Sequence, residues 1–162
     1  MESLESSNGK AKRKVSFICS KGSLDMALPA FIMGNAARMS GIEVNLFFTF
    51  WGMDIIKKST MNELHVSTVG NPSMHIPTML GGIPGMESFA TSQMKKQLEI
   101  LDIPEVPEFL EILQDSGAKL YACQLAADMF KLHKEDLYDG VDSIISAVDF
   151  FDIAEGGQII FI

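Results

Sequence analysis

Five short extended or apolar segments recur along the chain, separated by turns and by stretches with helical spacing. They are residues 15–19, 43–50, 118–122, 137–141 and 158–162. Most of them are rich in the aromatic and β-branched residues that favour strands. Strands that alternate with helices predict a three-layer α/β sandwich around a mostly parallel, five-stranded sheet. We expect the flavodoxin-like strand order 2-1-3-4-5 for this sheet.

The intervening stretches carry helix signals. Ser23 is a good N-cap for a helix that runs to about Ser40, and Gly41 closes it. Helical spacing resumes at Glu87, and a further helix after Pro104 ends at Gly117, a residue suited to the left-handed position after a helix. We expect two more helices, at 124–132 and 142–154.

Two stretches lack any regular period. Residues 1–13 are polar and predict a disordered tail, which leaves residues 14–162 as a single domain. Residues 59–86 are rich in glycine and proline and predict a long mobile loop. Within this loop the apolar segment Pro72 to Met86 could touch a membrane or a partner without spanning a bilayer.

Charge and composition narrow the function classes. A net charge of −8 argues against nucleic-acid binding, which needs clustered lysine and arginine. Two cysteines in 162 residues do not form a disulfide framework, so we expect a reducing, cytoplasmic location. No apolar run in the sequence is as long as the roughly 18 residues that a membrane helix needs. A hydrophobic content of 47% and a mean hydropathy of +0.18 favour a homo-oligomer with an apolar interface.

The clearest candidate for chemistry is Cys123, which ends the apolar strand 118–122 where a helix begins. Backbone N–H groups and the dipole at the start of a helix favour a thiolate over a thiol. Cys19 ends the first strand. In the expected strand order these two strands are neighbours, so both cysteines would lie in one crevice at the carboxyl edge of the sheet.

Other chemistries fit the spacing poorly. The chain has no C-x-x-C motif, and neither cysteine has the upstream proline and threonine or serine of a peroxiredoxin site. His65, His75 and His133 have no ligand set of recognised spacing around them, so we expect no metal. The Gly-containing turn at 20–23 lacks a nucleotide-binding motif, although the expected topology keeps a flavin-binding, flavodoxin-like protein as an alternative. A non-catalytic oligomeric scaffold is the other alternative.

Three runs of residues carry a family resemblance, namely Lys21 to Asp25, Phe47 to Met53, and Tyr121 to Gln124 with the Asp128-Met129 pair that follows it. They resemble the DsrE/DsrF-like family, and in particular its DsrE2-type branch, which is often labelled peroxiredoxin-like. The FFTFWG run is the most specific part, and the likeness extends from about Lys14 to Ile162.

The resemblance implies a five-stranded parallel α/β fold, homo-oligomers and a role in sulfur trafficking. In this family a cysteine at the start of a helix carries sulfur as a persulfide and exchanges it with TusA-like or rhodanese-like partner proteins. Cys123 matches that cysteine, and Cys19 is a weaker match that could serve as a second or resolving thiol. The activity implied is that of a sulfurtransferase-like carrier, and it needs no metal or organic cofactor.

Overall fold

The computed structural model describes residues 13–68 and 84–162. Residues 1–12 and 69–83 lie outside this description. The expected disorder of the tail therefore remains a prediction for residues 1–12, and so does the expected mobility of the loop over residues 69–83. The predicted membrane or partner contact of Pro72 to Met86 also falls almost entirely outside the described residues.

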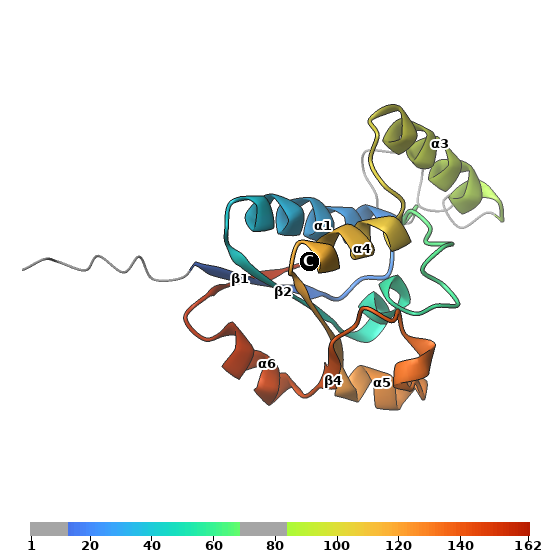
Figure 1. The fold of residues 1–162 in the computed structure, drawn as a ribbon. Coiled ribbons are helices and arrows are strands. Elements are labelled where there is room, and N and C mark those ends of the chain that lie inside the picture. The colour runs from blue at the N-terminus through green and yellow to red at the C-terminus, as the bar shows by residue number, and fades with distance from the viewer. Residues whose placement is uncertain (1–12, 69–83) are drawn as a thin grey trace, which may run out of the picture.

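A five-stranded sheet forms the middle layer of the molecule (Figure 1). All four strand pairings are parallel, so the predicted α/β class is confirmed. The strands are β1 Lys14–Cys19, β2 Glu43–Phe48, β3 Lys119–Cys123, β4 Ser143–Ile145 and β5 Gln158–Phe161.

The strand order is β4-β3-β2-β1-β5, and the predicted order 2-1-3-4-5 is wrong. β3 pairs with β2 rather than with β1, through the register Leu46 to Leu120 and Phe48 to Ala122. The chain therefore moves steadily from β1 to β4 in one direction. Only β5 returns to the other side of β1.

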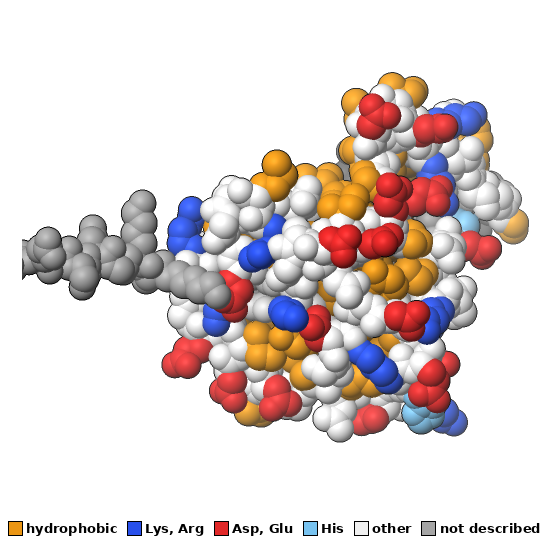
Figure 2. All heavy atoms as spheres, viewed as in Figure 1, with side chains coloured by type: hydrophobic (Ala, Val, Ile, Leu, Met, Phe, Trp, Pro, Cys, Tyr) orange, Lys and Arg blue, Asp and Glu red, His pale blue; other side chains and the backbone are white. Residues whose placement is uncertain are grey.

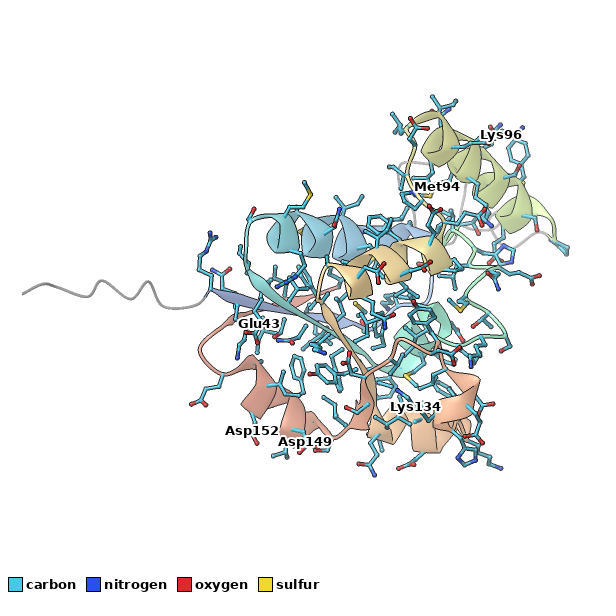
Figure 3. The ribbon with its side chains drawn as sticks, viewed as in Figure 1. Glu43, Met94, Lys96, Lys134, Asp149 and Asp152 are labelled. Carbon is cyan, nitrogen blue, oxygen red and sulfur yellow. The ribbon has the colours of Figure 1, made fainter. Side chains whose placement is uncertain are left out.

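Helices cover both faces of the sheet (Figure 1). α1 Leu24–Met39 and α4 Val106–Asp115 lie together on one face, whereas α5 Gln124–Phe130 and α6 Ala147–Ala154 lie on the other. Asp149 and Asp152 mark the outer side of α6 and point away from the sheet (Figure 3). This is the polar outer face expected of a helix that packs on a sheet.

The apolar residues of the strands alternate between the two helical layers, as a sheet buried on both faces requires. On the α1 and α4 face, Phe31 packs against Phe109 with ring centroids 5.4 Å apart. On the opposite face, Phe47 of β2 stacks on Phe150 of α6 at 4.7 Å. All four rings are at most 5% exposed.

The fourth strand lies later in the chain than predicted. Residues 137–141 form no strand: Leu137 makes an isolated antiparallel bridge with Lys57, and a turn follows at 139–140. Ile144 and Ile145, predicted to be helical, belong to β4 instead. They pair with Ala122 and Cys123 of β3. Two consecutive β-branched residues favour an extended backbone, and α6 begins only at Ala147, where Ser146 caps it.

Beyond β2 the chain leaves the sheet but stays packed on the core, in which Met53, Ile55 and Ile56 are buried. The 3-10 helix η1 Phe50–Ile55 follows β2 directly, and residues 59–68 contain turns but no helix or strand. α3 Met86–Ile100 stands at the periphery of the molecule (Figure 1). A buried hydrogen bond ties it to the body, in which the Val66 N–H donates to Thr91 Oγ1 at 2.9 Å. A second 3-10 helix, η3 Lys134–Asp136, precedes β4.

Candidate functional site

The carboxyl edge of the sheet has one place where neighbouring strands lead to opposite faces. β2 is followed by segments that lead to α4 on one face, and β3 is followed by α5 on the other. Ligands and reactive groups in open parallel sheets gather at such a switch point. The candidate site is therefore the edge between β2 and β3.

Cys123 lies at this edge, as the last residue of β3 and the N-cap of α5. Its backbone is extended, with φ −73° and ψ 123°, and the helix begins with the next residue. The side chain is buried, with 6% of its surface exposed, and it forms no disulfide. The predicted placement of Cys123 between a strand and a helix is confirmed.

The segment after β2 forms a tight turn beside Cys123. The Thr49 N–H donates to the carbonyl oxygen of Cys19 at 3.0 Å, and the Gly52 N–H donates to the Thr49 carbonyl at 2.9 Å. Phe50, between them, has a φ of +46°, which costs a non-glycine residue about 1–2 kcal/mol. Strained backbone of this kind persists only where its surroundings hold it, and it is common at functional sites.

Gly52 allows this turn to pack against the end of β1. A Cβ atom at this position would overlap the carbonyl group of Cys19, which belongs to the backbone and cannot rotate away. Gly22, in the turn after β1, approaches the Trp51 carbonyl in the same way. The glycine of the FFTFWG run is therefore needed for packing. It lets the turn after β2 lie against the end of β1, at the edge of the sheet where Cys123 lies.

Exposed apolar side chains surround this edge. Trp51 is 61% exposed and packs on Phe130 of α5, with ring centroids 5.3 Å apart. Leu125 and Met129, one turn apart on α5, are also at least half exposed. The FFTFWG run was predicted to end a strand and to mark the family, with no part in the site. Its aromatic residues at the end of a strong strand were the signal that Trp51 packs on α5, the helix that Cys123 caps.

Cys19 lies in a different environment from Cys123. It is 1% exposed within the core, and burial raises the pKa of its thiol to about 12. A thiolate is the form that attacks sulfur, so this environment suppresses the reactivity of Cys19.

The structure does not bring the two cysteines together, and the prediction that they share one crevice is wrong. β2 lies between their strands, and Cys19 is in register with Phe48 and Ala122. Two strand spacings separate the backbones by about 9.6 Å, beyond the roughly 7 Å that a disulfide can span. Since side chains alternate along a strand, Cys19 shares a face with Ala122, and Cys123 points to the opposite face.

The buried thiol of Cys19 predicts a particular loss of stability at alkaline pH. Its pKa rises from 9.0 in the unfolded chain to about 12 in the fold, so only the unfolded chain releases the proton between these values. The contribution of this thiol to the free energy of unfolding is fully present below pH 9. It then falls by about 1.4 kcal/mol per pH unit up to pH 12. The free energy of unfolding of wild type, measured by urea denaturation, should fall by about 4 kcal/mol more over this window than that of Cys19→Ala. Free energies of unfolding that fall in parallel for wild type and Cys19→Ala over this pH range would contradict the raised pKa of Cys19.

Neither a metal site nor a membrane span is present in the part of the chain that the structure describes. No group of three histidine, cysteine, aspartate or glutamate side chains there is arranged to hold a metal ion. No helix within residues 13–68 and 84–162 is long and apolar enough to cross a bilayer. His65 and His133 are exposed, and His75 lies outside the described residues.

Comparison with known proteins identifies relatives along nearly the whole chain. Residues 11–162 match the model of the DsrE/DsrF/DrsH-like family. The sulfur carrier protein DsrE2 of Allochromatium vinosum is 36% identical over 151 residues, which cover 88% of this chain and 93% of that protein. The uncharacterized protein YrkE of Bacillus subtilis is 26% identical over 160 residues, covering 93% of this chain and 97% of YrkE.

Solved structures share the fold at low sequence identity. The ychN protein from E. coli superposes with a TM-score of 0.57 at 14% identity, covering 93% of this chain and 99% of ychN. MTH1491 from Methanobacterium thermoautotrophicum gives the same TM-score at 13% identity, with the same coverage. These similarities concern the fold alone.

Proposed function

The chain belongs to the DsrE/DsrF/DrsH-like family, and on that basis we propose that it carries sulfur as a persulfide on Cys123. The placement of Cys123 carries the proposal, since this thiol ends an inner strand at the switch point and caps a helix. Similarity to a sulfur carrier protein over most of both chains supports a role in sulfur relay.

The exchange is a thiol–disulfide type of displacement. The Cys123 thiolate attacks the outer sulfur of a donor persulfide, and an S–S bond forms on Cys123 as the S–S bond of the donor breaks. The donor leaves as a thiolate, so sulfur moves without net oxidation and without a cofactor. Transfer onward repeats the step, with the thiolate of the acceptor attacking the outer sulfur held on Cys123.

Partner proteins in this relay would be TusA-like or rhodanese-like carriers that present a thiol or persulfide. Three exposed side chains on α5 or packed against it, Trp51, Leu125 and Met129, offer them an apolar surface on the helix that Cys123 caps. Methionine and aromatic side chains suit such contacts because they adapt to different partners. We place the exchange in the cytoplasm, where thiols stay reduced.

We also propose that the protein forms a homo-oligomer. Val148 and Phe151 of α6 and Phe161 of the edge strand β5 are each more than 60% exposed. An apolar edge strand is a surface that proteins rarely leave uncovered. Sedimentation velocity at several protein concentrations tests this, and a monomer throughout would contradict it.

Sulfur transfer to a partner tests the proposed function. The protein is loaded with polysulfide, freed of excess reagent, and mixed with a reduced TusA-like carrier. We expect one sulfur atom to move to the carrier, as seen in the intact masses of both proteins. The matched control is Cys19→Ser, which should transfer like wild type. A loaded protein that keeps its sulfur in the presence of such carriers and of rhodanese-like ones would contradict the relay.

A further inference from the structure

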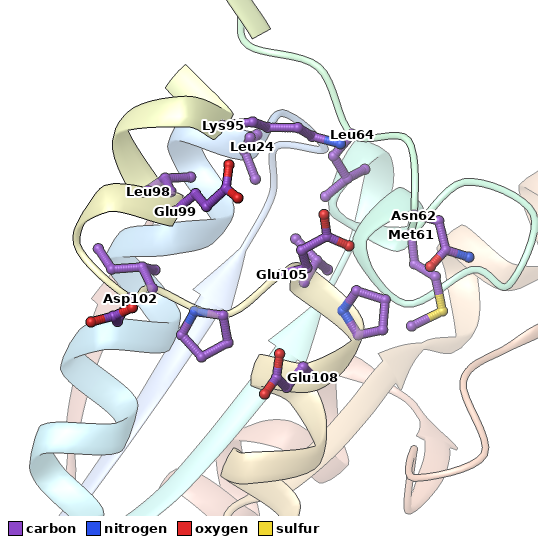
Figure 4. Close-up of a pocket in the computed structure, with 14 residues that line it drawn as sticks. Leu24, Met61, Asn62, Leu64, Lys95, Leu98, Glu99, Asp102, Glu105 and Glu108 are labelled. Atoms are coloured by element: carbon purple, nitrogen blue, oxygen red, sulfur yellow. The ribbon is translucent and has the colours of Figure 1, made fainter. Parts of the chain in front are cut away.

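A cavity lies away from Cys123, between α3, the start of α4 and residues 61–64 (Figure 4). It is a cavity of about 490 Å³, a volume within the range of small-molecule pockets. Leu24 at the start of α1 and Val106 at the start of α4 both line it. These helix starts lie at the carboxyl edge of the sheet, on the face opposite to that of Cys123.

The floor of the cavity is apolar. It is formed by aliphatic and methionine side chains that are buried or half-buried, namely Leu24, Met61, Leu64, Leu98, Ile103 and Val106. Two hydrogen bonds hold the surrounding segments in place. The Leu24 N–H donates to the His65 carbonyl at 2.8 Å, and the Val66 N–H donates to Thr91 Oγ1 of α3.

The lining carries strong negative charge. Glu99, Asp102, Glu105 and Glu108 contribute four carboxylates, against the single ammonium group of Lys95. Figure 4 shows Glu99 of α3 and Glu105 before α4 turned into the same space from two different segments. Acidic side chains also gather on the surface where α3 meets the body (Figure 2).

These carboxylates have no cationic partner among the residues that the structure describes. The ion pairs found there are Lys14–Glu43, Lys57–Asp54, Lys58–Asp139 and Lys119–Asp142, and none involves the cavity. Glu99 and Glu105 therefore share a space beside an apolar surface without a described counter-ion, which favours a cation from outside the chain.

We propose that this cavity binds a small aliphatic organic cation. The ammonium group of the ligand lies between Glu99 and Glu105, and its hydrocarbon body covers the apolar floor. Three features select this class: the volume admits a small molecule, the floor admits an aliphatic chain, and the carboxylates reject an anion. The site involves no thiol and does not depend on the proposed sulfur chemistry.

Titration with n-octylammonium, followed by amide chemical shifts in NMR, tests the proposal. We expect saturable binding with shifts centred on residues 95–108, and affinity that increases from butylammonium to octylammonium as the chain covers more of the floor. Octanoate, which has the same chain length and the opposite charge, should bind at least about tenfold more weakly. Equal binding of octanoate, or no change along the alkyl series, would overturn the proposal.

Matched variants locate the charge. The double variant Glu99→Gln/Glu105→Gln should weaken octylammonium binding by about tenfold. Glu87→Gln/Glu155→Gln removes the same charge outside the cavity and should bind like wild type. Equal affinity of the two double variants would overturn the proposal. Cys123→Ser should also bind like wild type, which separates this result from any failure of the sulfur assays.

A last titration separates a free amine from a protein side chain. The capped dipeptide Leu-Lys carries the same aliphatic ammonium group on a peptide backbone. We expect it to bind more weakly than octylammonium. Tighter binding of the dipeptide would overturn the assignment to a small molecule, and it would indicate docking of a basic peptide.

Discussion

Gly52→Ala is expected to destabilise the protein by about 3 kcal/mol or more. The added methyl group would overlap the Cys19 carbonyl, which belongs to the backbone, and a methyl group fixed to Cα cannot rotate away from it. Relief therefore requires that the turn after β2 move away from the end of β1. The same movement breaks the hydrogen bond from the Thr49 N–H to the Cys19 carbonyl.

Gly156→Ala is the matched control for this change. Gly156 has a φ of +72°, and a Cβ atom there would meet nothing within 4 Å. Its replacement should therefore cost only about 1–2 kcal/mol of backbone strain. The free energies of unfolding of both variants, measured by urea denaturation, test whether Gly52→Ala is the more destabilising change. A Gly52→Ala variant as stable as Gly156→Ala would mean that the turn is not packed against β1.

Alkylation is expected to distinguish the two thiols by a large factor. At pH 8, a pKa of about 12 leaves about one Cys19 thiol in 10⁴ ionised, a thousandfold fewer than in the unfolded chain. Folding should therefore slow the reaction of Cys19 with iodoacetamide by about a thousandfold. Cys123, at the edge of the sheet, should remain reactive in the folded protein.

Single-cysteine variants make this measurement clean. Cys123→Ser reports on Cys19 alone and Cys19→Ser reports on Cys123 alone, each with and without denaturant. Rates are followed by intact mass. Two inert thiols in the folded protein would favour the scaffold alternative, in which the cysteines are structural. Fast alkylation of Cys19 in the folded Cys123→Ser variant would show that the core around β1 opens readily.

Much of the fold follows from local patterns in the sequence. Residues 15–19, 43–48 and 158–161 have the β-branched and aromatic content of strands, and they form β1, β2 and β5. The helices at α1 and α4 follow the spacing of their apolar residues. The fourth strand was misplaced because Ile144 and Ile145 fit a helical face as well as a strand. Such short apolar runs are ambiguous by periodicity alone.

Strand order is a property of the connections rather than of the strands. The sequence of residues 119–123 does not indicate whether this strand pairs with β1 or with β2. The answer depends on α4 lying beside α1 on one face, which positions the start of β3 next to β2. The sequence therefore predicted Cys123 at the end of a strand, but it misjudged its neighbour. That neighbour is the turn with Trp51 and Gly52, and Cys19 lies two strands away.

The central claim is that Cys123 holds the sulfur. The most direct test is the intact mass of the reduced protein after reaction with polysulfide and removal of excess reagent. Wild type and Cys19→Ser should each gain the mass of one sulfur atom, and peptide mapping should place it on Cys123. Cys123→Ser should gain none. An adduct that survives in Cys123→Ser, or that disappears in Cys19→Ser while that variant stays folded, would contradict the claim.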